Sequence, residues 1–390
     1  MWTDDEEDQL YGAGERFMID YVTYKQLHSD PQTLKKAFPH LNVRDRKEIS
    51  PEMMELDEPP PFPEGLVFPP TIIGYNLRQK KWLDLKVDRI HNANWNEDAF
   101  EHLVVDNETK VLIRALISSK VEADQGTDVI GGKGNGLIIL LHGGPGTGKT
   151  FTAESVAEIA RKPLYRVTCG DIGTKPQEVE KYLESVLYLG KIWDCVVLLD
   201  EADVFLEQRT LMDLERNALV SVFLRVLEYY EGILILTSNR VGTFDEAFKS
   251  RIQLSLHYEA LTKSQRSTIW KNFITRLKTL ETSAAQKSVE SGNINNSERL
   301  TPEISNTQQL PSIDYGDIER HIEELAKLKM NGRQIRNIIT TGRQLAKYER
   351  VQMSFSHLKR VIKVSSKFDD YLKKVTGNTD EEAAREDGRR

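Results

Sequence analysis

The chain has 390 residues, of which 39% are apolar and 29% are charged, and its formal net charge is -7. This apolar content excludes a wholly disordered protein, and roughly 150 residues per domain suggests two or three domains. The longest apolar runs are far shorter than the roughly 20 residues of a membrane span, the first ten residues carry no base, and two cysteines are too few for a disulfide scaffold. We therefore expect a soluble intracellular protein with reduced thiols, most simply in the cytoplasm.

Acidic side chains are concentrated in the N-terminal part of the chain. Residues 1–64 hold 15 acids and 7 bases, a net charge of -8, so the remainder is close to neutral at +1. Within it, the β-branched and aromatic residues 17–24 predict a strand, and six prolines in residues 59–70 predict a stiff, extended connector. We assign residues 1–71 to an acidic segment with a proline-rich linker, and expect it to be the remnant of a larger domain.

From residue 72 onward, strand-like runs alternate with helix-like runs. Residues 136–142 form a continuous apolar run bounded by glycine, as is typical of a strand covered on both faces, and four more strand candidates are residues 164–169, 195–199, 233–236 and 252–258. Between them apolar residues recur at helical spacing, for example Ala153, Val156 and Ala157. The alternation predicts an α/β fold over residues 72–260, with a mostly parallel sheet covered by helices on both sides.

The first apolar run leads into a glycine-rich loop. Glycines permit backbone angles at which successive N–H groups converge on phosphate oxygens, and the following helix adds positive charge at its N-terminus. Lys149 supplies a charge for the β- and γ-phosphates, and the Thr150 hydroxyl suits Mg²⁺. A plain glycine-rich turn is the disfavoured alternative. We predict a nucleotide-binding loop made of Gly143, Gly144, Pro145, Gly146, Thr147, Gly148, Lys149, Thr150 and Phe151.

Two later strands end in polar side chains. Asp200 follows a buried run and lies where a carboxylate could hold Mg²⁺ through water, whereas Glu201 alternates to the other side and could polarise an attacking water. Asn239 closes the next strand, where an amide could orient that water. A helix-capping acid and a turn-forming asparagine are the structural alternatives, and the phosphate loop favours the catalytic interpretation.

The C-terminal third of the chain shows helical periodicity and no strand pattern. Residues 261–368 are therefore predicted to form an all-helical unit. Residues 282–312, rich in Ser, Thr, Asn and Gln, predict a disordered insertion, and residues 369–390 predict a charged tail. Residues 327–363 hold ten bases and one acid. A solvated helix face is the preferred interpretation, and a phosphate-facing or partner-facing surface is the alternative.

The order of these motifs resembles that of the AAA branch of the AAA+ ATPases. The matching stretches are residues 143–150, 198–203, 236–240 and 244–251, and the resemblance covers roughly residues 85–365. It implies a P-loop NTPase core with a parallel five-stranded sheet, a helical lid, ATP and Mg²⁺ as ligands, and a homo-oligomeric ring, expected to be a hexamer with ATP at subunit interfaces. More weakly, residues 11–85 resemble the linker of fungal single-ring AAA proteins whose upstream region is uncharacterised.

The resemblance also implies roles for individual residues. Lys149 and Thr150 correspond to the phosphate-loop lysine and threonine. Asp200 corresponds to the residue that holds Mg²⁺, and Glu201 to the one that activates water. Asn239 corresponds to the first sensor of the nucleotide state.

Two arginines complete the implied site, and some positions depart from the family pattern. Arg251 resembles the finger that reaches the neighbouring subunit's γ-phosphate, and Arg333 resembles the second sensor. Phe248 stands where many members have another finger arginine, and Ser250 replaces the usual glycine. The stretch 169–173 lacks the pore-loop aromatic, which leaves Ile172 as its only large apolar residue and weakens a threading mechanism.

Three functions follow from this pattern. The preferred one is a Mg²⁺-dependent ATPase whose ring remodels or disassembles a macromolecular client, most simply a protein. The alternative is a nucleic-acid-stimulated motor or loader that uses the basic lid. A nucleotide-binding scaffold without hydrolysis is disfavoured by Asp200, Glu201 and Arg251. Residues 100–104 lie where family members cradle adenine, with local core packing as an equal alternative.

Overall fold

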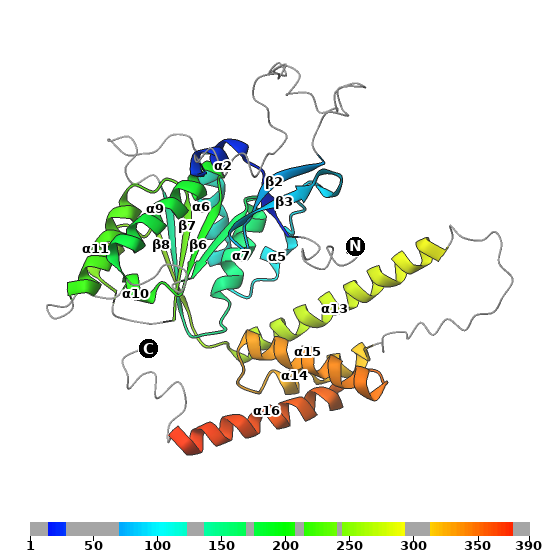
Figure 1. Ribbon diagram of the computed structural model, residues 1–390. Helices are drawn as coiled ribbons and strands as arrows, with labels where there is room; N and C mark the ends of the chain where they lie inside the picture. Colours follow the sequence, from blue (N-terminus) through cyan, green and yellow to red (C-terminus); the bar gives the residue numbers. More distant parts are fainter. Residues whose placement is uncertain are drawn as a thin grey trace, which may run out of the picture. The chain divides into compact units, whose positions relative to one another are not determined.

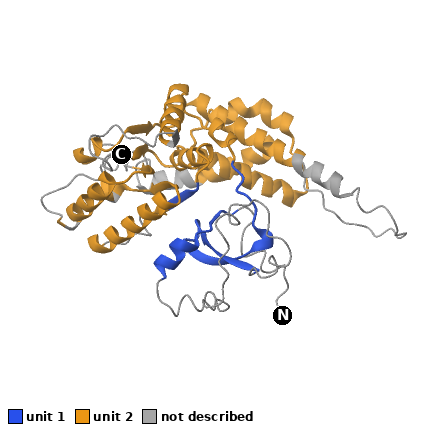
Figure 2. Ribbon diagram, turned by 90° about the horizontal axis from the view of Figure 1, so that it is seen from above, with its two compact units in different colours: residues 1–95, 163–166 blue, residues 96–162, 167–390 orange. Residues whose placement is uncertain are grey.

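The computed structural model describes residues 15–28, 70–122, 136–168, 175–206, 214–239, 244–292 and 313–376. The chain divides into two compact units, which Figure 2 shows in blue and orange. The first comprises residues 1–95 and 163–166, and the second comprises residues 96–162 and 167–390. The first unit thus includes residues 72–95, which the sequence pattern places in the α/β core.

The first unit contains a small antiparallel sheet in the order β1-β2-β3. Its elements are β1 (Phe17–Met18), α2 (Tyr21–Leu27), β2 (Thr71–Asn76), β3 (Lys81–Lys86) and the short 3-10 helix η2 (Val87–Arg89). The predicted strand over residues 17–24 is wrong beyond Met18. The Asp20 carboxylate accepts hydrogen bonds from the backbone N–H of Thr23 at 3.0 Å and from its hydroxyl at 2.5 Å, so it caps a helix there.

A five-stranded sheet has the order β5-β6-β7-β4-β8, and all of it except residues 164–166 of β5 belongs to the second unit. The strands are β4 (Leu137–Gly143), β5 (Leu164–Thr168), β6 (Val196–Asp200), β7 (Ile233–Ser238) and β8 (Leu254–Tyr258). The pairs β4–β7, β4–β8 and β6–β7 are parallel, and every residue of β6 and β7 is buried. The predicted parallel sheet is confirmed, and the carboxyl ends of its strands meet at one edge.

Helices cover this sheet. They are α5 (Asp98–Glu101), α6 (Asn107–Glu122), α7 (Lys149–Ile159), α9 (Pro176–Ile192), α10 (Asp203–Leu206), α11 (Leu214–Glu228) and α12 (Glu246–Lys249). Figure 1 shows α9 and α11 running along the strands, and α7 and α9 both contact β6. Ala153, Val156 and Ala157 of α7 are buried, as their helical spacing predicts. None of the helices in the described part of the chain combines the length and apolar composition of a membrane span.

The C-terminal part of the second unit is a helical lid, as predicted. It consists of α13 (Lys263–Gly292), α14 (Tyr315–Leu325), α15 (Gly332–Glu349) and α16 (Phe355–Thr376), drawn from yellow to red in Figure 1. Its core is a cluster of large apolar side chains that includes Trp270, Ile318, Ile335 and Leu358. Within the described residues of the lid, the one β interaction is an isolated bridge between Ile313 and Met353.

Two boundaries of the lid differ from the sequence expectation. Helix α13 continues to Gly292, so it covers the first eleven residues of the segment 282–312, and residues 293–312 lie outside the described part. Ala284, Ala285 and Gln286 favour helix, a local preference that the overall polar composition of the segment hides. Likewise α16 extends over residues 369–376 of the predicted tail, whose residues 377–390 are not described.

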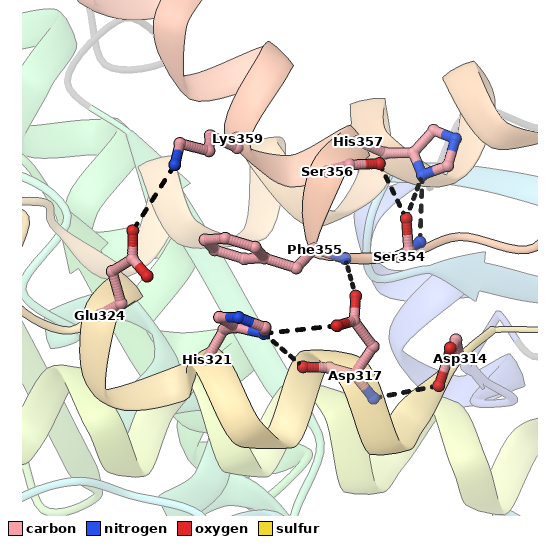
Figure 3. Close-up of polar contacts among 9 residues, drawn as sticks. All are labelled: Asp314, Asp317, His321, Glu324, Ser354, Phe355, Ser356, His357 and Lys359. Carbon is pink, nitrogen blue, oxygen red and sulfur yellow. Dashed lines mark hydrogen bonds and ion pairs between the residues drawn. The ribbon is translucent and has the colours of Figure 1, made fainter.

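Polar side chains connect α14 to α16 within the lid (Figure 3). The N–H of Phe355, the first residue of α16, donates to a carboxylate oxygen of Asp317 at 2.8 Å. The ring of His321 stacks on Phe355 with centroids 4.1 Å apart, and Lys359 lies 3.8 Å from the carboxylate of Glu324. These acids therefore hold helices of the lid together.

Candidate nucleotide-binding site

The predicted phosphate loop joins the end of β4 to the start of α7, and its backbone requires glycine. Gly143, Gly146 and Gly148 have φ angles of +140°, +72° and +112°, which side-chain-bearing residues rarely adopt. A Cβ atom on Gly143 would lie 2.1 Å from the carbonyl oxygen of Tyr258 in β8, and one on Gly146 would lie 2.6 Å from the side chain of Asn331. Strand β8 and the residue that caps α15 therefore pack closely against the loop, and they leave no room for a side chain at these two glycines.

Lys149 is held inside the curve of this loop. Its side chain is buried, and its ammonium group donates to the carbonyl oxygens of Gly143 at 2.8 Å and Gly144 at 2.7 Å. The Thr147 hydroxyl also donates to the Gly144 carbonyl, at 2.8 Å. The loop therefore surrounds a positive charge at the N-terminus of α7, a geometry suited to phosphate oxygens.

Hard oxygen atoms from α7, β6 and β7 meet next to the loop. The Thr150 hydroxyl lies 3.3 Å from Asp200 Oδ1, and the Thr237 hydroxyl donates to the same oxygen at 2.5 Å. Asp200 is 7% exposed. A hydroxyl and a carboxylate side by side are the donors that Mg²⁺ prefers, so these residues fit the predicted ion.

Glu201 lies directly beyond the end of β6. Its φ of +59° is in the left-handed region, which costs a non-glycine residue about 1 kcal/mol. The strand β7 stabilises this turn, because the Glu201 N–H donates to the Thr237 hydroxyl at 3.0 Å and the Ala202 N–H donates to the Thr237 carbonyl at 2.8 Å. The turn leaves the Glu201 side chain exposed at the sheet edge while Asp200 stays buried.

Asn239 follows β7 at the same edge, and Asp203 positions it. The carboxylate of Asp203 accepts hydrogen bonds from the Ser238 hydroxyl and from the Asn239 N–H, the latter at 3.1 Å. Sequence reasoning assigned no role to Asp203 or to Thr237. Both residues belong to the polar runs that follow the apolar strands, which is the only sign of them in the sequence. Their hydrogen-bond partners depend on how β6 and β7 are aligned in the sheet.

Arg251, the predicted finger, follows α12 and is bound within its own chain. Its guanidinium donates to the Ala247 carbonyl at 2.9 Å and forms an ion pair of 3.1 Å with Glu228 of α11. Its Nε atom is buried and has no hydrogen-bond partner. Phe248, which replaces a second finger arginine, is fully buried against Phe223, so that position serves the core.

Arg333 lies at the start of lid helix α15, which reaches the phosphate loop. The Gly332 N–H donates to the Gly146 carbonyl at 3.0 Å, and Asn331 forms a capping box with Gln334. Arg333 is exposed and follows directly on the residue that contacts the loop. The structure thus brings the N-terminus of α15 to the site that the sequence predicted.

The remaining predicted positions lie elsewhere. Phe100 is fully buried and Leu103 is 5% exposed, as expected for the core-packing alternative at residues 100–104. The pore-loop stretch 169–173, with Ile172, lies outside the described residues. Beside the loop, the ring of His142 stacks on His257 with centroids 4.9 Å apart, and burial lowers the His142 pKa. A neutral imidazole therefore adjoins the loop at neutral pH.

Comparisons with known proteins match this architecture. A model of the ATPase family associated with various cellular activities (AAA) matches residues 139–260, and a model of the fungal AAA+ ATPase lid domain matches residues 261–379.

Among curated relatives, human ATPase family AAA domain-containing protein 3B is 29% identical over 35% of this chain and 22% of its own length. The outer mitochondrial transmembrane helix translocase of Danio rerio is 29% identical over 34% of this chain and 37% of its own. The Lon protease of Frankia alni is 28% identical over 31% of this chain and 17% of its own. The matched region therefore spans well under half of these relatives. From the two adjoining family models and the sheet, loop and lid that they cover, the chain belongs to the AAA family of ATPases and has a lid of the fungal AAA+ type.

Proposed function

We propose that this protein binds ATP with Mg²⁺ and hydrolyses it to ADP and phosphate. The observation that carries the proposal is the meeting of the phosphate loop with Asp200, Thr150 and Glu201 at one edge of the sheet, where the Thr150 hydroxyl lies 3.3 Å from Asp200. The phosphate loop alone would be sufficient for nucleotide binding without hydrolysis. The second carboxylate, exposed beyond Asp200, supports hydrolysis.

Each group at this edge has a proposed task. The N–H groups of the loop and Lys149 bind the phosphates, while Thr150 and Asp200 hold the metal, which would offset negative charge on the phosphates when bound. Glu201 accepts a proton from the attacking water, and Asn239 orients that water. Arg333 contacts the phosphates from the lid, so that nucleotide binding links the lid to the sheet.

Arg251 extends the proposed site to a second copy of the chain. In a homo-oligomeric ring, which we expect to be a hexamer, it would stabilise charge on the ATP of the neighbouring subunit. The ion pair with Glu228 and the hydrogen bond to the Ala247 carbonyl fix the position of its guanidinium group. Hydrolysis would then change the contacts between neighbouring subunits, which is how such a ring remodels a client.

We propose that this client is a protein. The Danio rerio relative is named a transmembrane helix translocase and the Frankia alni relative a protease, so both printed names refer to polypeptides. This chain covers 37% and 17% of them, which makes the client class a proposal by analogy.

Single-turnover hydrolysis tests the proposed activity. Purified full-length protein in excess over labelled ATP should convert it to ADP with Mg²⁺, and EDTA should stop the conversion. If the ATP remained intact after many binding half-lives, the proposed hydrolysis would be wrong. The protein would then be a nucleotide-binding scaffold that does not hydrolyse ATP.

Subunit mixing tests the ring. Arg251→Ala and Lys149→Ala chains should each be inactive alone, since one lacks the finger and the other lacks nucleotide binding. Mixed rings should regain part of the activity, because an Arg251→Ala subunit can receive the intact finger of a Lys149→Ala neighbour. Full activity in dilute monomer would contradict action across an interface.

A further inference from the structure

The basic run over residues 327–363 divides into two groups in the structure. Lys359 lies 3.8 Å from Glu324, and Arg360 pairs with Glu349 at 2.6 Å. The same Glu349 carboxylate lies 3.3 Å from Nε2 of His357. The single acid of this run is therefore bound by side chains of α16, and it does not neutralise the remaining bases.

Three of those remaining bases form a basic stripe on α15, defined here as Arg336, Arg343 and Lys347. They are seven and four residues apart, so at about 100° per residue they fall within about 40° of one another, over roughly 16 Å of helix. All three side chains are exposed, and among the described residues no acid forms an ion pair with them. Thr340 lies on the same face between them.

The composition around the stripe separates it from an ordinary solvated face, where charges of both signs are mixed. Residues 327–348 hold six bases and no acid. Two of the three stripe residues are arginines, which bind phosphate through paired hydrogen bonds. At the end of α15, Tyr348 is 86% exposed and lies about 100° around the helix from Lys347, so a strand that follows the stripe must turn at the helix end to stack on this ring. Cations along a ridge with an exposed aromatic ring are the features that bind single-stranded nucleic acid, through its phosphates and stacked bases.

We propose that the basic stripe and Tyr348 form a binding surface for single-stranded nucleic acid. A single strand that runs along α15 would bring its phosphates next to the three cations of the stripe. This ligand is additional to the protein client and does not depend on the proposed hydrolysis. Because α15 begins at the hydrogen bond from Gly332 to Gly146, a strand bound to this helix would act on the element that contacts the phosphate loop.

Fluorescence anisotropy with labelled 20-nucleotide single-stranded RNA and DNA tests the surface on the full chain. Three contacts predict a slope of about -2 for log affinity against log salt, hence roughly 20-fold weaker binding at 200 mM than at 50 mM salt. The triple variant Arg336→Glu, Arg343→Glu and Lys347→Glu should bind at least tenfold more weakly at 50 mM salt, and its basal ATPase rate should stay unchanged. Unaltered affinity in a variant with a normal melting temperature would overturn the proposal.

A matched control separates the stripe from overall charge. The variant Arg276→Glu, Lys363→Glu and Lys367→Glu makes the same change in net charge at exposed positions of α13 and α16. It should keep the wild-type affinity within about twofold. An equal loss in both triple variants would show that overall charge is responsible and would contradict a localised surface. If the glutamate variant of the stripe fails to fold, the corresponding glutamine variant repeats the test.

Two further experiments identify the class of ligand. Tyr348→Ala should weaken oligonucleotide binding severalfold, because the stacking contact is lost. Polyglutamate of the same total charge should displace the oligonucleotide at least tenfold less effectively than unlabelled oligonucleotide does. Equal displacement by polyglutamate would contradict nucleic acid and show that the stripe binds acidic polypeptides.

Discussion

The carboxyl edge of the sheet and the α14–α16 junction of the lid both gather acidic side chains, but with different partners. At the sheet edge, Asp200 accepts hydrogen bonds from hydroxyls of residues 50 and 37 positions away in sequence. At the lid junction, Asp317 of α14 accepts the N–H that opens α16, and Glu324 of α14 lies 3.8 Å from Lys359 of α16. Parallel strand register concentrates the first set at one point, whereas the second set is distributed along helix ends.

This difference implies different consequences of mutation. Changes at the sheet edge should alter nucleotide binding or turnover and leave the fold intact. Changes at the lid junction should lower stability and leave the chemistry intact. Substitutions in the two regions test that separation.

The largest effect is expected from Lys149→Ala at the sheet edge. Removal of the ammonium group takes away the charge inside the loop, so affinity for ATP should fall by about 100-fold, near 2.7 kcal/mol. Titration with a fluorescent ATP analogue measures this, and the melting temperature without nucleotide checks the fold. Wild-type affinity in a folded variant would show that the loop does not bind the phosphates.

Gly146→Ala tests the contact between the two regions. The added Cβ would lie 2.6 Å from Asn331 at a φ of +72°, so the loop or the start of α15 must move. We expect roughly tenfold weaker ATP binding, from about 1 kcal/mol of backbone strain and the displaced contact.

Gly316→Ala is the matched control for this variant. Gly316 lies in α14, where the nearest atom to an added Cβ is 3.7 Å away. This variant should bind ATP as the wild type does. If both variants bound ATP with the same affinity, the positive φ angle and close packing of Gly146 would not matter for nucleotide binding.

The smallest effect on function is expected from Asp317→Ala in the lid. The variant loses the acceptor for the Phe355 N–H, which should lower the free energy of unfolding by about 1 kcal/mol. Chemical denaturation measures the stability, and steady-state ATPase assays should give a turnover number within about twofold of wild type. A large loss of turnover at unchanged stability would place this junction in the catalytic machinery.

Much of the sheet and its site could be predicted from the sequence. The central strands β4, β6 and β7 are buried on both faces and leave apolar runs, and a phosphate loop needs glycines at fixed spacing. The sequence therefore predicts these strands and the positions of Lys149 and Asp200, whereas the partly exposed edge strands β5 and β8 give a weaker, mixed pattern. The partners of these residues were not readable. The contact of Thr237 with Asp200 and that of Gly332 with Gly146 join residues far apart in sequence, and they depend on strand register and lid packing.

The errors arose where local signals compete. Residues 17–24 have strand-like composition, yet the side chain of Asp20 starts helix α2 within them. The hairpin of β2 and β3 went unrecognised because the sequence pattern was assigned to the α/β core. The polar residues after 282 suggested disorder, although α13 continues to Gly292 through strong helix formers.

The central claim is that one edge of the sheet both binds ATP and hydrolyses it, and Glu201→Gln tests it most directly. The substitution keeps the size of the side chain and removes its ability to accept a proton from water. ATP affinity should stay within about threefold of wild type, while the single-turnover rate constant should fall by at least about 100-fold, within the range of a catalytic base. Hydrolysis at the wild-type rate by this variant would contradict the account.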